Sequence, residues 1–203
     1  MQWLKWSISL LQQSEKMASK SILPRGFKAE AERLSESYRA HLKLSKFDPL
    51  DAFKLANFLG IPIVSFYDFV DEQIASKLEN TFDAMWMPNA DGDKIIIHNT
   101  KQSAFRQQSN LMHELAHIIR KHEIPDEIKN LVVPLNLHYY NELHEQEAKY
   151  LGGCLQITRA GLFWALKRKF TYEQISDYFG ASVDMVRYRV NSTGVGKQLA
   201  YMK

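Results

Sequence analysis

The order of hydrophobic patterns along these 203 residues predicts an α+β fold, in which a small sheet containing an antiparallel pair packs against several helices. Helical periodicity, with apolar residues three and four positions apart, fills most of the chain before residue 60 and after residue 103. Residues 61–99 instead hold short β-branched runs separated by turn residues. The order of helices, a small sheet and further helices, without an internal repeat, is typical of the α+β class.

Two helices are expected ahead of the strands. The first spans residues 21–44, where apolar side chains recur on one face of the helix. In the second helix, Asp48 is the predicted N-cap and Pro49 takes the first helical position. Gly60 is expected to end this helix in a left-handed conformation.

The predicted sheet begins with Ile61–Phe66, a short β-branched run that follows a glycine. A β-hairpin is expected over Asp83–Asn99, because Asp91-Gly92 is a strong hairpin turn signal between two apolar runs. The intervening residues 67–80 fit either a short helix or a loop.

Helical patterns resume after the sheet. One helix is expected over residues 103–120, capped by Ser103 or Thr100, and another over residues 141–155. Residues 121–140, which include two prolines, form the connection between these two helices.

The chain is expected to end in a group of short helices. A helix capped by Thr158 is followed by two shorter ones, capped by Thr171 and Ser182, which meet at Gly180. Residues 192–203 show no helical pattern and are predicted to be irregular.

Composition favours one globular domain. We expect a main domain over residues 21–157, an N-terminal extension over 1–20 and a C-terminal helical segment over 158–203 that packs on the domain. Lys and Arg number 26 and Asp and Glu number 23, so the net charge of +3 does not by itself indicate nucleic-acid binding. The single cysteine, Cys154, excludes an internal disulfide framework and a multi-cysteine zinc finger, and is expected to be a small buried residue.

The sequence predicts a cytoplasmic location, from the lack of a membrane span and the features of the N-terminal stretch. No apolar run approaches the roughly 20 residues that a membrane span needs. The N-terminal apolar stretch, Trp3–Leu11, is broken by Lys5 and precedes no small-residue cleavage site, so a signal peptide is not favoured. An amphipathic helix, or translation that starts at Met17, explains this stretch better.

The sharpest chemical feature is His113-Glu114-Leu115-Ala116-His117, an H-E-x-x-H pattern within a predicted helix. Residues four apart lie on one face of a helix, so both imidazoles can reach the same ion. Neutral histidine nitrogen is a good Zn²⁺ ligand, and Glu114 lies beside the first ligand, where it can activate a water. Apolar flanking residues indicate that both histidines face inward, where two unpartnered imidazoles would be costly. The pattern therefore predicts a zinc site.

A catalytic zinc needs a third protein ligand and an open fourth position. The candidates lie on the following helix, where Glu145 and Glu147 are two residues apart, so that only one of them can face the metal. His144 is a further possible ligand. The residues alone leave these alternatives open.

Four passages resemble the ImmA/IrrE-type zinc metallopeptidases, over about residues 23–195. The resemblance is carried by the following passages: DPLDAFKLANFLGIPI, IIIHNTKQSAFRQQSNLMHELAHIIRKH, EQEAKYLGGCLQITRAGL and ISDYFGASVDMVRYRVNSTGV. H-E-x-x-H occurs in many metallohydrolases, and its combination with the E-x-E-A passage is much more specific. Three positions differ from the family pattern: Lys149 stands where Asn or Asp is usual, Ala116 replaces a glycine and Thr158 replaces a proline.

The resemblance implies a gluzincin-like site. Its two histidine ligands correspond to His113 and His117, its third ligand to Glu145, with Glu147 as second choice, and its catalytic glutamate to Glu114. A donor for the developing oxyanion is not assigned; the candidates near the connection are His138, Tyr139, Tyr140 and His144.

The resemblance also implies a kind of substrate. Similar proteins cut helix-turn-helix repressors or antitoxin-like partners, often in stress responses or mobile elements. The competing hypothesis is a regulatory binding module with a structural or vestigial zinc site that acts through protein or DNA contacts. Lys149 and the basic C-terminal segment support that alternative: from residue 149 onward Lys and Arg number nine and acidic residues three, with Arg187 and Arg189 on the second of two short helices around Gly180. Direct nucleic-acid binding is the less favoured interpretation.

Overall fold

The computed structural model describes residues 22–89, 91–123 and 141–202. The predicted N-terminal extension, most of the connection after residue 120, and the candidates His138, Tyr139 and Tyr140 lie outside these residues. The elements follow one another as α2 (Phe27–His41), α3 (Ala52–Leu59), β1 (Ile63–Ser65), η1 (Phe66–Asp68), α4 (Glu72–Leu78), β2 (Ala84–Pro88), β3 (Lys94–His98), α5 (Ala104–Ile119), α7 (Glu142–Gln156), α8 (Arg159–Lys167), α9 (Tyr172–Phe179), α10 (Val183–Thr193) and α11 (Val195–Tyr201). This order confirms the predicted α+β class.

The sheet has three strands in the order β1-β3-β2. The predicted hairpin is confirmed: β2 pairs antiparallel with β3, with Trp86 opposite Ile96. The turn is closed by Asn89, whose side-chain oxygen accepts from the backbone N–H groups of Asp91 and Asp93. β1 pairs with the other edge of β3 in parallel, so that Ile63 also lies opposite Ile96.

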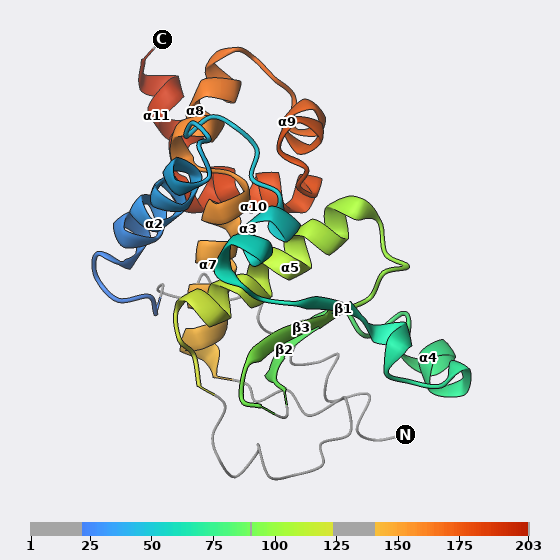
Figure 1. Cartoon of the computed structure of the whole chain (residues 1–203). Helices are drawn as coiled ribbons and strands as arrows, with labels where there is room; N and C mark the ends of the chain where they lie inside the picture. The colour runs from blue at the N-terminus through green and yellow to red at the C-terminus, as the bar shows by residue number, and fades with distance from the viewer. Residues whose placement is uncertain (1–21, 90, 124–140, 203) are drawn as a thin grey trace.

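Helix α5 crosses the middle of the molecule (Figure 1). It packs against β2 and β3 on one side and against α7 on another, while α8 to α11 gather at the opposite end from the sheet. Buried side chains of α5 and α7 form the centre of the main core, among them Leu111, Leu115, Leu151 and Leu155. Because apolar packing holds both helices, their facing polar residues are placed with little freedom.

The cap predicted at Asp48 is wrong. Helix α3 begins at Ala52 because the Asp51 side chain accepts from the backbone N–H of Lys54. Asp48 instead closes the preceding turn by accepting from the backbone N–H of Ser45, and Pro49 lies outside the helix. The end of the helix is as predicted, since Gly60 has a φ of 69° in the left-handed region.

Several other boundaries differ from the prediction. Helix α2 is shorter than residues 21–44, because Gly26 and Lys43 adopt positive φ angles at its two ends. Strand β1 covers only three residues, and the ambiguous residues 67–80 contain α4, which Asp71 caps. The chain end is not irregular: α11 follows Gly194 and buries Val195.

The predicted caps of the C-terminal segment (residues 158–203) are confirmed. The side chains of Thr158, Thr171 and Ser182 each accept from a backbone N–H three residues on. The segment has its own apolar cluster, which includes Leu162, Phe179 and residues from α10 and α11. The domain boundary at residue 157 stays a prediction.

Within the described residues, the structure contains no helix that is long and apolar enough to cross a membrane.

Candidate metal centre

Helix α5 brings the two histidines of the H-E-x-x-H pattern together. The Nε2 atoms of His113 and His117 lie 3.1 Å apart, one helical turn from each other. His117 is buried with 7 % of its surface exposed, whereas His113 is partly open. The helix therefore presents two imidazole nitrogens to the same point in space.

Glu145 completes this group from the facing helix α7. Its Oε2 lies 3.2 Å from Nε2 of His113, and its Oε1 lies 3.4 Å from Nε2 of His117. The three potential ligand atoms all lie within 4.8 Å of one another, a separation that one ion can bridge. We call His113, His117 and Glu145 the metal cluster. Two imidazoles and one carboxylate are a donor set that suits zinc and leaves a fourth position for water or substrate.

A close helix crossing holds Glu145 at this distance. A Cβ atom added to Gly152 on α7 would lie 3.0 Å from the carbonyl oxygen of Met112 and 3.2 Å from the backbone nitrogen of His113. Because glycine has no Cβ, α7 can approach the backbone of α5 beside the first histidine. Residue 152 therefore helps to set the spacing between the two helices that carry the cluster.

Glu114 lies next to the cluster and is held by the sheet. Its Oε2 accepts a hydrogen bond of 3.0 Å from the backbone N–H of Trp86 on β2. Burial raises the pKa of Glu114 to about 7, although the neighbouring His113 and the Trp86 hydrogen bond act in the opposite direction. A carboxyl group with a pKa near neutrality can both accept and return a proton.

The two histidines differ in their electrostatics. Burial, followed by the charge of protonated His113, lowers the pKa of His117 to about 3. Burial also opposes protonation of His113, but its hydrogen bond with Glu145 and the nearby Glu114 charge outweigh this and raise its pKa. Neutral His117 is the form that can bind a metal ion.

Glu147, the second choice for the third ligand, points elsewhere. Its Oε2 accepts from Nε of Arg120 at 3.0 Å and lies 3.1 Å from Nε2 of His122. His144 stacks on the His122 ring, with centroids 4.1 Å apart and planes 4° apart. Neither residue belongs to the metal cluster in the part of the chain that the structure describes.

His122 is a site residue that the sequence analysis did not identify. Its Nδ1 lies 2.9 Å from Nδ1 of His117, and it is buried. It follows the end of α5, so helical spacing gave no reason to place it beside His117. The only available signal was the presence of a third histidine soon after the H-E-x-x-H pattern.

Lys149 does not join the metal cluster. It is exposed on α7, and its ammonium group lies 5.0 Å from the centre of the Tyr188 ring.

Cys154 is fully buried, as predicted, and burial raises the pKa of its thiol well above the ordinary range.

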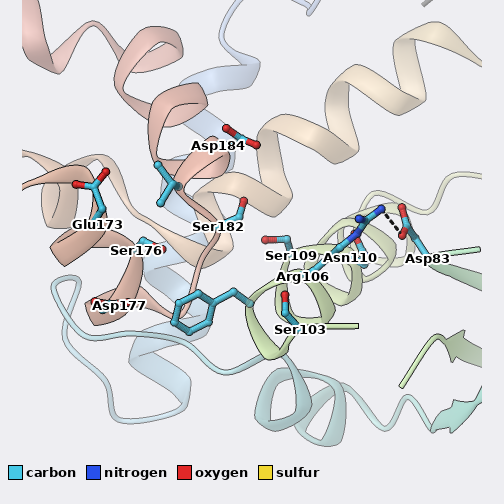
Figure 2. Close-up of a pocket in the computed structure, with 12 residues that line it drawn as sticks. Asp83, Ser103, Arg106, Ser109, Asn110, Glu173, Ser176, Asp177, Ser182 and Asp184 are labelled. Carbon is cyan, nitrogen blue, oxygen red and sulfur yellow. Dashed lines mark hydrogen bonds and ion pairs between the residues drawn. The ribbon is translucent and has the colours of Figure 1, made fainter. Parts of the chain in front are cut away.

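The structure also contains a cleft of about 690 Å³, with mostly polar residues in its lining, between the start of α5 and the helices α9 and α10 (Figure 2). An ion pair between Arg106 and Asp83, 2.9 Å long, lies at one end of the cleft. Its other lining residues are Ser103, Phe105, Ser109, Asn110, Glu173, Ser176, Asp177, Ser182, Val183 and Asp184. None of the metal-cluster residues lines this cleft, and Glu114 does not either.

The helices around Gly180 offer little for DNA contact. Arg189 is fully buried, where it donates to the carbonyl of Ile157 and pairs with Glu32. Arg187 is exposed but pairs with Asp184 on its own helix, at 2.9 Å. Neither arginine is presented as an unpaired cation for a phosphate group.

Comparison with known protein families agrees with this geometry. Residues 71–191 match the model of the Peptidase_M78 family, described as the IrrE N-terminal-like domain. This match covers more than half of the chain, so the protein belongs to that family of metallopeptidases.

Comparison with curated proteins finds no match. Among solved structures, a Mycobacterium tuberculosis transcriptional regulator is similar in fold, with a TM-score of 0.50 and 14 % sequence identity. The alignment covers 83 % of this chain and 47 % of the regulator, so the chain spans about half the length of that protein.

Proposed function

We propose that this protein is a zinc-dependent endopeptidase. The observation that carries the proposal is the convergence of His113, His117 and Glu145 from two helices onto one point, beside a carboxyl group with a near-neutral pKa. Membership of the Peptidase_M78 family supports the same chemistry. In this proposal the three residues of the metal cluster hold zinc, and Glu114 is the catalytic acid–base.

Different groups have different roles in the proposed peptide hydrolysis. When bound, zinc supplies a Lewis acid that lowers the pKa of water and polarises a carbonyl group. Glu114 takes the proton of the attacking water and later passes it to the leaving amine, which its raised pKa favours. The backbone N–H of Trp86 donates to Oε2 of Glu114 and holds the carboxylate in place during both transfers.

The proposed substrate is a protein, and specifically a helix-turn-helix repressor or an antitoxin-like regulator in the cytoplasm. The resemblance to the ImmA/IrrE-type peptidases supports this substrate class, and the burial of Arg189 speaks against the competing role as a DNA-binding module. Incubation with candidate repressors, with and without a chelator, tests the substrate class directly.

The substitution Glu114→Gln tests the catalytic role. It keeps the size of the side chain but removes the acid–base group, so we expect zinc binding to persist while cleavage falls by about 10²–10⁴-fold or more. The exposed Glu142→Gln on α7 is the matched control and should cleave like the unmodified protein. Cleavage that survives in Glu114→Gln would contradict the assignment.

A further inference from the structure

A line of hydrogen-bonding side chains continues behind the metal cluster. Nδ1 of His117 lies 2.9 Å from Nδ1 of His122, and Nε2 of His122 lies 3.1 Å from Oε2 of Glu147. His117, His122 and Glu147 are each at most 7 % exposed. We call these three residues the imidazole chain.

The guanidinium group of Arg120 holds the last residue of the imidazole chain, Glu147, in place. Nε of Arg120 donates to the same Glu147 oxygen at 3.0 Å, and its Nη1 donates to Glu30 of α2 at 2.7 Å. The guanidinium group balances the buried Glu147 carboxylate, so the chain ends on a fixed acceptor. A carboxylate accepts hydrogen bonds but has no proton to donate.

This fixed acceptor sets the direction of every hydrogen bond in the chain. His122 must carry its proton on Nε2 to donate to Glu147, which leaves Nδ1 of His122 as an acceptor. His117 must then carry its proton on Nδ1 to donate to His122. The remaining nitrogen of His117, Nε2, keeps its lone pair and faces Glu145 and His113.

We propose that His122 is a positioning residue for the metal cluster: with Glu147 it fixes the tautomer and the ring orientation of His117 so that Nε2 is ready to bind a metal ion. This inference rests on the proposed function, since it assumes that the cluster holds zinc. A hydrogen-bonded group behind a metal-bound imidazole typically changes metal affinity by about 10–100-fold when it is removed.

Packing supports a positioning role rather than a loose contact. The ring of His144 lies parallel to the His122 ring at 4.1 Å, which restricts rotation of His122 out of the line between His117 and Glu147. Glu145 and Glu147, two residues apart on α7, point to different sides of that helix. The two glutamates serve opposite ends of one histidine: Glu145 faces its Nε2, and Glu147 supports its Nδ1 through His122.

The test compares His122→Phe with His41→Phe, a control at an exposed histidine on α2. Zinc affinity is measured by competition with a chelator, and the ¹⁵N shifts of the imidazole nitrogens are measured in metal-free protein. We expect His122→Phe to bind zinc about 10–100-fold more weakly than the unmodified protein. The unmodified protein should show His117 protonated on Nδ1, and the variant should lose this single tautomer. The control should change neither.

A second pair of variants keeps the test decisive if His122→Phe folds poorly. Glu147→Gln retains an acceptor oxygen for His122, so it should lose less zinc affinity than Glu147→Leu, which retains none. Zinc affinity and a His117 tautomer that match the unmodified protein in His122→Phe would overturn the inference. If the unmodified protein binds no zinc, the proposed function fails, while the tautomer in metal-free protein still decides whether the imidazole chain orients His117.

Discussion

Individual residues of the site were predictable to different degrees. The pairing of His113 with His117 follows from helical spacing alone, and the structure brings the two Nε2 atoms within 3.1 Å. The choice of Glu145 over Glu147 was not available from periodicity and needed the resemblance to a family. Both glutamates lie on the same helix, and only the position of α5 relative to α7 decides which one faces the histidines.

His98 provides a pH-dependent stability test at the residue scale. Its side chain is buried at the end of β3, and its Nδ1 has no hydrogen-bond partner among the described residues. Burial lowers its pKa below the ordinary 6.5, so the folded protein keeps His98 neutral where the unfolded chain takes up a proton. The contribution of His98 to stability is therefore fully present above about pH 6.5 and is lost as the pH falls.

The substitution His98→Phe should reduce this loss. We expect the free energy of unfolding of metal-free protein to fall less between pH 7 and pH 5 in the variant than in the unmodified protein. Urea unfolding at both pH values measures the difference. The contributions of the other buried histidines to the pH dependence cancel in this comparison, because both proteins retain them. An equal decrease in the two proteins would contradict the account of His98.

Among the elements, the crossing of α5 and α7 positions the site. Gly152→Ala would place a methyl group 3.0 Å from the backbone of α5, so the helices must separate. We expect a destabilisation of about 1–3 kcal/mol, together with weaker zinc binding because Glu145 moves with α7. Thermal unfolding and chelator competition measure the two effects.

Gly196 offers the matched control for that substitution. It lies within α11, where an added Cβ would meet only Val190, at an ordinary 3.5 Å. Gly196→Ala should be neutral or stabilising by up to about 1 kcal/mol, and it should leave zinc affinity unchanged. If Gly152→Ala behaves like Gly196→Ala, the crossing does not set the geometry of the site.

The element boundaries show where sequence patterns stop being informative. The caps at Thr158, Thr171 and Ser182 were predictable because each is a short polar residue directly ahead of a helical pattern. Only Asp48 was predicted as the cap of α3, and the observed cap is Asp51. The backbone N–H of Ala52 donates to the side chain of Gln108, 56 residues away, and this remote contact helps to fix the start of the helix. Helix α11 has two nearby glycines that weaken its local signal, and burial of Val195 stabilises it.

At the scale of the whole molecule, two buried arginines join distant segments. Arg39 of α2 donates to the carbonyls of Leu155 and Gln156, and Arg189 of α10 donates to the carbonyl of Ile157. These carbonyls lie at the C-terminal end of α7, where a helix leaves acceptors unpaired. Burial of Arg189 could not be predicted from the sequence, because it depends on contacts with segments that are remote in the chain.

Arg189→Met should therefore destabilise the protein instead of weakening DNA binding. Removal of the guanidinium group breaks the ion pair with Glu32 and takes a donor from the Ile157 carbonyl, and loss of one partner of a buried ion pair typically costs about 3–5 kcal/mol. Arg187→Met, at the exposed arginine two residues earlier, should change stability by no more than about 0.5 kcal/mol. Chemical unfolding compares the two variants, and similar stabilities would refute the structural role of Arg189.

The central claim is that His113, His117 and Glu145 hold one zinc ion between α5 and α7, and metal analysis of purified protein tests it most directly. We expect about one zinc per chain in the unmodified protein and in the control Glu142→Ala, and little or none in Glu145→Ala, because removal of one of three ligands opens the site. Absence of zinc from correctly folded unmodified protein supplied with the metal, or full zinc content in Glu145→Ala, would contradict the account.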